Sequence, residues 1–279
     1  MGRLAVLVGA CLLLPSSLGA DTAPQIATTT STARPELAPP DLEPPAIDDS
    51  PETIVPGEHV RLDTAAGPVH VWWPEGYDAS TAVTIVYVHG YWVDVDDAWL
   101  QHGLPEQFGA AAVNALFIAP DAPVTKWDDV NWPSLTRLLE TVGHELPIPA
   151  GPVIALGHSG AFRTLAEWVK DARLDTLVMF DSGYGSMIPF RDWARASPKH
   201  RMITVGDDTR EWTSYLNHWL GTKVTLDIND VVADPTARTR IAKERLVHIK
   251  SSIGHMTLVT GASALPSLLR VLAAPLPSE

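Results

Sequence analysis

The chain is 279 residues long, 46% of its residues are hydrophobic, and its formal net charge is −13. This acidic balance argues against nucleic acid and anionic membrane surfaces as partners, because their phosphate groups would be repelled. The length and the hydrophobic content suffice for one large core or for two small ones.

The first twenty residues have the features of a secretory signal peptide. Arg3 supplies a short positive start, residues 4–14 are apolar but too few to span a bilayer, and small residues near Ala20 suit cleavage. We therefore expect a secreted or periplasmic protein with no stable membrane insertion after signal cleavage. The segment around Cys11 faintly resembles a lipoprotein box, which leaves a lipid anchor as a minority alternative. Otherwise the only cysteine is lost with the signal.

Residues 21–56 are rich in Pro, Thr, Ser and Ala and hold few large apolar side chains. Such a segment cannot bury enough apolar surface to order itself, so it is predicted to be a disordered Pro/Thr-rich linker. The folded domain is then expected over residues 57–279.

Strands and helices alternate from residue 57 onward. An antiparallel pair is predicted first, followed by buried strands that alternate with amphipathic helices. This order predicts an α/β fold with a mostly parallel central sheet and helices on both faces, and ligands then bind at the carboxyl ends of the strands. The predicted strands are 59–63, 69–73, 82–88, 115–119, 153–156, 174–180, 201–205 and 246–250, and the helices are 97–112, 132–146, 161–170, 210–220 and 262–273.

Ser159 lies where a predicted strand turns sharply into a predicted helix. A serine at the apex of such a turn takes strained backbone angles, so its neighbours two positions before and after must be small. Gly157 and Ala161 occupy those positions. This layout suits a nucleophile, and the alternative reading of Ser159 is an ordinary helix N-cap.

A nucleophilic serine needs a base, and an acid that orients the base. His255 follows the last predicted strand, so its place in the chain suits the base. The acid has two candidate positions. Asp181 leaves an apolar strand, where a carboxylate is costly unless it is paired, and we favour it. Asp207 and Asp208 follow the next strand in a polar turn, where they could instead cap a helix.

An oxyanion hole needs two backbone N–H donors that point at the developing charge. Gly160, next to the serine, offers one. Tyr91 offers the other, because His89 and Gly90 follow a buried strand and allow a tight turn there.

Two further residues are candidates for binding substrate. Trp92 lies in the same strand-end loop, where its ring could stack on a sugar or an aromatic acyl group. His158 is adjacent to the serine, although its side chain is expected to point away from the reacting groups. No metal site is predicted, because the loop with Asp94 and Asp96 lacks the glycine and the distal glutamate of a calcium-binding EF-hand loop.

From residue 59 to the C-terminus the chain resembles the α/β-hydrolase superfamily. The resemblance rests on the His89–Gly90 pair, on residues 157–161 and on the Gly254–His255 pair, with Ala161 where the usual motif has glycine. Residues 180–185 also resemble poorly characterised exported bacterial members, in which an Asp-x-x-Tyr-Gly segment follows the strand after the serine; this supports Asp181. The resemblance implies an α/β-hydrolase fold, a catalytic triad of Ser, His and Asp, and no cofactor.

The expected function is therefore that of an exported serine esterase acting on a small-molecule or polymer-borne ester. Two alternatives remain open. The same triad would serve an amidase or a peptidase, and a non-catalytic binding or scaffold protein could retain the fold.

Overall fold

The computed structural model describes residues 54–273. The predicted signal peptide, Cys11 with the lipoprotein alternative, and most of the predicted linker lie outside these residues, as do residues 274–279. Just before the predicted start of the domain, the N–H of Val55 donates to the carbonyl of Gly109 at 3.2 Å. None of the described helices has both the length and the apolar character needed to cross a bilayer.

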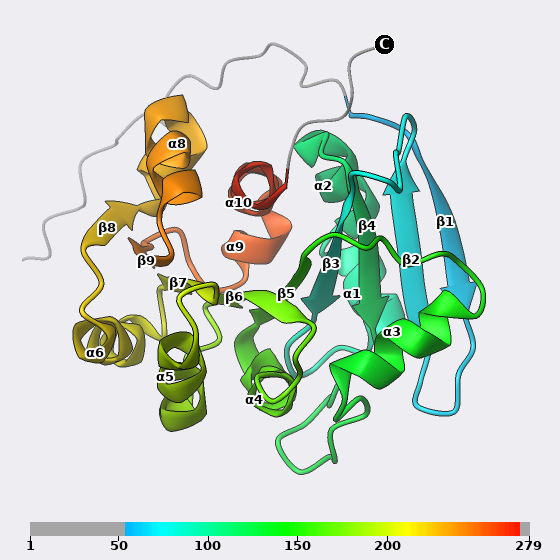
Figure 1. Ribbon diagram of the computed structural model, residues 1–279, viewed down its shortest axis with the longest axis horizontal. Coiled ribbons are helices and arrows are strands. Elements are labelled where there is room, and N and C mark those ends of the chain that lie inside the picture. The colour runs from blue at the N-terminus through cyan, green and yellow to red at the C-terminus, as the bar shows by residue number, and fades with distance from the viewer. Residues whose placement is uncertain (1–53, 274–279) are drawn as a thin grey trace, which may run out of the picture. The chain divides into compact units, whose positions relative to one another are not determined.

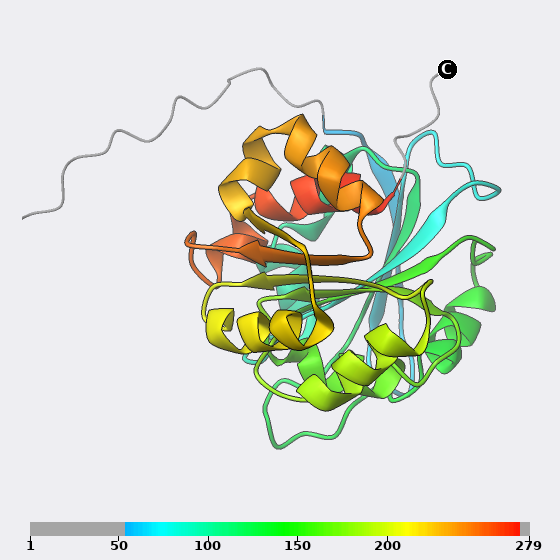
Figure 2. The ribbon, with the colours of Figure 1, turned by 60° about the vertical axis from the view of Figure 1, so that its left-hand side comes forward.

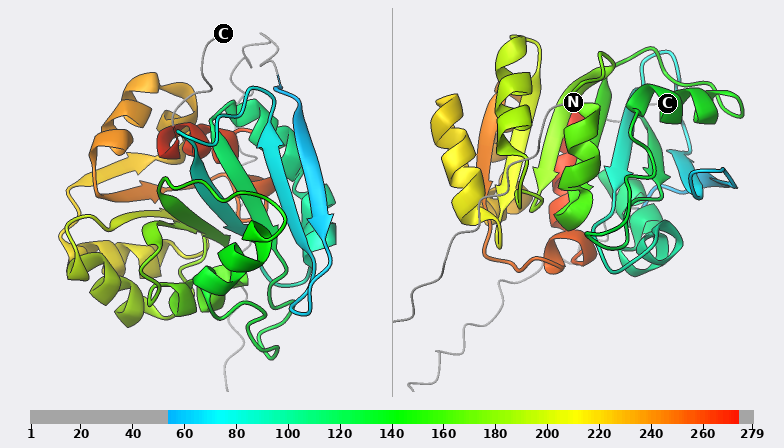
Figure 3. Two further views of the ribbon diagram at one scale, coloured as in Figure 1. Left: turned by 45° about the vertical axis from the view of Figure 1, so that its right-hand side comes forward. Right: turned by 90° about the horizontal axis from the view of Figure 1, so that it is seen from below.

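A nine-stranded sheet forms the centre of the described chain (Figure 1), in the order β1-β2-β4-β3-β5-β6-β7-β9-β8. The pairs β1–β2 and β2–β4 are antiparallel and the other pairs are parallel. Figure 3 shows the antiparallel edge in blue and cyan. The strands are β1 (Gly57–Leu62), β2 (Val69–Pro74), β3 (Val83–Val88), β4 (Ala115–Pro120), β5 (Val153–His158), β6 (Leu174–Phe180), β7 (Arg201–Gly206), β8 (Val224–Asp227) and β9 (Leu246–Lys250).

Helices cover both faces of the sheet, and Figure 2 shows the sheet between the two layers. One apolar core lies under α1, α2 and α7 to α10, and the other lies under α3 to α6. Alternate strand residues enter the two cores, as Tyr87 and Val88 do. The helices are α1 (Val95–Gln101), α2 (Leu104–Ala111), α3 (Leu135–Gly143), α4 (Phe162–Trp168), α5 (Met187–Ala196), α6 (Arg210–Leu220), α7 (Ile228–Ala233), α8 (Pro235–Lys243), α9 (Thr257–Thr260) and α10 (Ala264–Leu272).

The predicted class, a mostly parallel sheet with helices on both faces, is confirmed, and some details were wrong. The single helix predicted over 97–112 is two helices, because Gly103 adopts a φ of 56° and Pro105 cannot donate a backbone hydrogen bond. Residues 221–245 form β8, α7 and α8, residues 181–200 contain α5, and residues 251–261 contain α9, although no element was predicted in any of these ranges.

The parallel register aligns the ends of the central strands, so the loops that follow them meet at one edge of the sheet. These loops carry Ser159, Asp181, Asp207 and His255. The paired residues at the strand ends are Val88 with Gly157, His158 with Phe180, Phe180 with Val205, and Gly206 with Lys250.

Candidate active site

Ser159 occupies a strained turn between β5 and α4. Its φ of 54° lies in the left-handed region, which residues other than glycine rarely adopt. A Cβ on Gly157 would lie 2.8 Å from the Cβ of Ala161, so the turn brings these two positions into contact, and alanine still fits. The helical turns at Ser159–Ala161 and in α4 have no side-chain cap, so the reading of Ser159 as an N-cap is wrong.

The loop after β3 packs directly on this serine. A Cβ on Gly90 would lie 2.6 Å from the Cβ of Ser159 and 3.2 Å from its Oγ, and one on Gly160 would lie 2.6 Å from the ring of Tyr91. Any side chain at position 90 would therefore displace the serine. A glycine is needed there for close approach, in addition to the tight turn that the sequence predicts.

His89 holds this loop in place through both ring nitrogens. Nδ1 donates to the carbonyl of Gly90 at 2.8 Å, and Nε2 accepts from the N–H of Ala122 at 3.0 Å. This pairing requires the neutral tautomer with its proton on Nδ1. The described chain has no cis peptide, so the N–H of Tyr91 points away from the fixed Gly90 carbonyl. No residue in the range 54–273 accepts a hydrogen bond from that N–H.

His255 is hydrogen bonded to Asp181, not to the alternative acids. Its Nδ1 lies 2.7 Å from Oδ2 of Asp181 and 3.9 Å from Oδ2 of Asp208. The Asp181 carboxylate also accepts from the backbone N–H groups of Asp207, Asp208 and Thr209 and from Thr209 Oγ1. Five hydrogen bonds therefore hold one fully buried carboxylate, and the second candidate loop serves as its support.

These contacts shift the pKa values of both partners. Burial raises the pKa of Asp181, but hydrogen bonds from His255, Thr209 and the backbone of Asp207 outweigh burial and hold that pKa well below its usual range. Burial lowers the pKa of His255, but the hydrogen bond to Asp181 and the charges of Asp181, Asp208 and Asp207 raise it above its ordinary value. The pair is therefore an ionised carboxylate beside an unusually basic imidazole.

The chain was compared with known proteins. No protein-family model and no curated protein matches its sequence. Among solved structures, the feruloyl esterase module from Clostridium thermocellum gives a TM-score of 0.52 at 11% identity, with 82% of this chain and 93% of that chain covered. A structure described only as FAE gives a TM-score of 0.52 at 12% identity, with 80% and 92% covered.

This chain has the α/β-hydrolase fold. The expectation from the sequence is confirmed at the level of the fold. In the α/β-hydrolase fold of this chain, the strained serine, the loop of Gly90 and the histidine with its carboxylate all follow strands at the carboxyl edge of the sheet.

A cavity of about 610 Å³ opens over the serine in this α/β-hydrolase fold. Ser159 and His255 both line it, although no hydrogen bond joins them within residues 54–273. Triad hydrogen bonds are often long before substrate binds. Trp92 lines this cavity, and its side chain is 83% exposed. Its φ of 76° lies in the left-handed region. A residue that stacks on a substrate needs such an accessible ring. The remaining lining is largely aromatic and apolar, with Tyr91, Val93, Phe162, Tyr184 and Met256.

His158 lies against His255, so the expectation that its side chain points away from the reacting groups is wrong. The two ring centroids are 4.4 Å apart, and Nε2 of His158 donates to the carbonyl of His255 at 3.2 Å. Burial, together with repulsion from His255 and His102, lowers the pKa of His158 to about 3. A ring that is neutral near neutral pH therefore packs against His255, a contact that the sequence did not predict.

The α/β-hydrolase fold also brings Asp181, Asp208 and His255 close enough to suggest a metal site. Both oxygens of Asp181 already accept hydrogen bonds, and Nδ1 of His255 is one of the donors. A cation would have to displace these donors, so the donor set does not fit a metal ion. In the loop that the sequence analysis compared with a calcium-binding loop, Asp94 caps α1, and Asp96 forms an ion pair with Arg61.

Proposed function

We propose that this protein is a serine hydrolase that cleaves a carboxylic ester, with Ser159 as nucleophile, His255 as base and Asp181 as acid. The observation that carries the proposal is the 2.7 Å hydrogen bond from His255 to the fully buried carboxylate of Asp181. His255 and the strained Ser159 line the same cavity. The pairing orients the base and raises its basicity, as acyl transfer requires.

In the first step, Nε2 of neutral His255 takes the proton of Ser159 while Oγ forms a bond to the ester carbonyl carbon. The tetrahedral intermediate collapses when its bond to the leaving oxygen breaks and His255 protonates that oxygen. A water molecule, deprotonated by His255, then attacks the acyl-serine. Collapse releases the acid and returns the proton to Ser159. Asp181 holds the tautomer and stabilises the imidazolium throughout.

The developing oxyanion would be held by the backbone N–H groups of Tyr91 and Gly160. The N–H of Tyr91 has no acceptor in the described part of the chain, and the His89 contact fixes the direction of its peptide plane. A donor that is already oriented adds little reorganisation cost, which is the physical basis of this stabilisation.

The cavity favours an apolar acyl group. Phe162, Tyr91 and Met256 supply apolar surface, and the exposed ring of Trp92 could stack on an aromatic acid. The structural neighbour named as a feruloyl esterase agrees with an ester substrate. The predicted signal peptide adds export to the proposal, with a mature N-terminus after residue 20.

The test is labelling of the purified protein with a fluorophosphonate probe. We expect the wild type to be labelled and Ser159→Ala and His255→Ala to be unlabelled. Ser80→Ala and His144→Ala are matched controls at exposed positions and should label as the wild type does. A folded wild-type protein that takes up no label would contradict the proposal and favour the non-catalytic alternative. Turnover of amides in preference to esters would favour the amidase or peptidase alternative.

A further inference from the structure

Helix α6 exposes a row of aromatic side chains. Trp212, Tyr215 and Trp219 are 53%, 55% and 44% exposed. Their spacing of three and four residues places them side by side on one face of the helix. The helix buries its opposite side, with Thr213 and Leu216, against the sheet. Three half-exposed aromatic rings in a row form an apolar surface of the kind that marks a binding site.

A polar groove runs along the same helix. It is an open surface depression of about 740 Å³, lined by Asp207, Asp208, Arg210 and Glu211 together with Ser214, Tyr215 and His218. Tyr215 belongs to both features, so the aromatic row borders the groove. The groove offers carboxylates, two hydroxyls, a guanidinium and an imidazole, which together both donate and accept hydrogen bonds.

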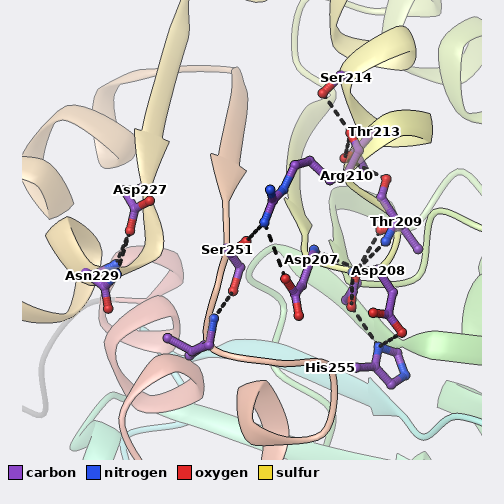
Figure 4. A network of polar contacts seen from close by, with 12 residues as sticks. Asp207, Asp208, Thr209, Arg210, Thr213, Ser214, Asp227, Asn229, Ser251 and His255 are labelled. Carbon is purple, nitrogen blue, oxygen red and sulfur yellow. Dashed lines mark hydrogen bonds and ion pairs between the residues drawn. The ribbon is translucent and has the colours of Figure 1, made fainter. Parts of the chain in front are cut away.

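This groove begins where the catalytic cavity ends. The Asp208 carboxylate lines the groove and lies 3.9 Å from Nδ1 of His255, and it accepts a hydrogen bond from Tyr184 Oη at 3.4 Å. Tyr184 and His255 both line the catalytic cavity. Figure 4 shows Asp208 beside His255, with Arg210 and Ser214 following on α6.

The position of the groove relates it to one half of the substrate. His255 protonates the leaving oxygen, so the alcohol part of an ester leaves on the histidine side of the cavity. The groove starts at Asp208, beside the Nδ1 edge of the same ring, and Tyr184 connects it to the cavity. Tyr91 and Phe162, which suit an acyl group, line the cavity rather than the groove. The groove is therefore placed to hold the alcohol part.

Charge and polarity limit what that alcohol can be. Three carboxylates, those of Asp207, Asp208 and Glu211, outnumber the one guanidinium, Arg210, which is already paired with Asp207. The negative balance argues against anionic lipids and phosphorylated ligands. The density of hydrogen-bonding groups argues against a purely apolar chain. A sugar combines apolar C–H faces, which stack on aromatic rings, with hydroxyls that pair with carboxylates and imidazoles.

We propose that the α6 groove and its aromatic row bind a neutral oligosaccharide or polysaccharide whose hydroxyl carries the scissile ester. This rests on the proposed function and specifies the substrate class as a polymer-borne sugar ester. Asp208 and Glu211 accept hydrogen bonds from sugar hydroxyls, while Tyr215, Trp212 and Trp219 stack on successive rings.

Binding is tested with the inactive Ser159→Ala protein, titrated calorimetrically with xylohexaose, mannohexaose and cellohexaose. We expect at least one of them to bind, and Tyr215→Ala and Trp212→Ala, each placed in the Ser159→Ala background, to weaken its binding at least tenfold. Trp127→Ala in the same background is the matched control, because Trp127 is 82% exposed and does not line the groove. It should bind as the parent does.

The active protein supplies a second readout. The ratio of kcat/KM for acetylated xylohexaose to that for 4-nitrophenyl acetate should fall at least tenfold in Tyr215→Ala. Failure of all three oligosaccharides to bind, or binding that is equal in every variant, would overturn the inference. So would binding of α6 to phosphatidylcholine vesicles, or association of two copies of the chain that the Trp212→Ala change abolishes.

Fluorophosphonate labelling separates the two proposals. Labelling without oligosaccharide binding would support the proposed hydrolase activity and contradict the proposed sugar site on α6. Oligosaccharide binding that depends on Tyr215, without labelling, would support the sugar site on α6 and contradict the proposed hydrolase activity.

Discussion

Nδ1 of His255 and Oδ2 of Asp181 are 2.7 Å apart although 74 residues separate them in the chain. The contact joins the loop after β9 to the loop after β6, with β7 between the two strands. The loop after β7 closes this gap, because the backbone N–H groups of Asp207, Asp208 and Thr209 all donate to the same carboxylate. The Asp181 carboxylate is thus held in place by the protein alone, and His255 is oriented with it.

Asp181→Asn should remove most of the activity while leaving the domain folded. The amide can no longer hold the productive tautomer of His255, and the equivalent change in other triads lowers kcat by roughly 10⁴. The measurement is kcat on 4-nitrophenyl acetate. Asp208→Asn is the matched control, because its carboxylate lies 3.9 Å from His255 and is not hydrogen bonded to it. A larger loss of kcat in Asp208→Asn than in Asp181→Asn would show that the acid lies in the loop after β7 and not in the loop after β6.

The activity should depend on pH through His255. The base must be neutral in the free enzyme, and its pKa is raised, so kcat/KM should rise with pH through a midpoint above the ordinary 6.5. The charge of Asp208 contributes to that increase, so Asp208→Asn should move the midpoint to lower pH. The profile is measured from pH 5 to 9 on both proteins. A midpoint that stays the same or moves upward would contradict this electrostatic account.

His89→Phe should lower kcat without a comparable effect on KM. Loss of the Nδ1 bond frees the Gly90 carbonyl, so the N–H of Tyr91 loses its fixed direction, and loss of one oxyanion donor typically costs about 10²–10³ in kcat. The buried site should also lose about 1–3 kcal/mol of stability.

His248→Phe controls for that loss of stability. His248 is buried in β9 and bonded to Thr204 and Asn217, away from the catalytic cavity. It should be destabilised to a similar extent and keep its kcat at a temperature at which both variants are folded. Equal losses of kcat in the two variants would mean that His89 acts only through stability.

The sequence predicted elements best where an apolar run or a helical period was uninterrupted. The bounds of β6 (Leu174–Phe180) and α6 (Arg210–Leu220) agree with the prediction. Residues 221–245 gave no such signal. β8 has four residues at the edge of the sheet with alternate side chains exposed, and α8 consists largely of arginine, threonine, lysine and alanine, which leave it without a continuous apolar stripe. Both elements are therefore stabilised by packing against the rest of the domain, and their own sequences carry little hydrophobic periodicity.

The sequence located the candidate site by chain order, and it could not choose among carboxylates that follow neighbouring strands. Asp181 and Asp208 both end near His255, because the parallel register places both loops at one edge. What separates them is the direction of three backbone N–H groups, which no residue type encodes. The hydrogen bond from the Thr209 hydroxyl to Asp181 and the contact of His89 with Ala122 were not predicted either, since each depends on a partner distant in the sequence.

Acid should destabilise the protein in a range where carboxylates are still ionised. Burial, followed by repulsion from nearby charges, lowers the pKa of His158 to about 3 and those of His102 and His248 to about 4. In the unfolded chain these rings return to about 6.5. Between these values the unfolded state binds more protons than the native state, so the free energy of unfolding falls as pH decreases below about 6.5.

For each buried histidine the loss between pH 7 and pH 5 should be on the order of 1–2 kcal/mol. Urea unfolding at pH 7, 6 and 5 measures it. His248→Gln removes one of the three groups and should make the dependence on pH shallower, and His144→Gln, at an exposed position, is the control variant. A stability that stays flat down to pH 5 would show that all three of these rings gain a proton within the folded protein. The His158 ring would then be able to repel the protonated His255, and the neutral state assigned to it beside the base would be wrong.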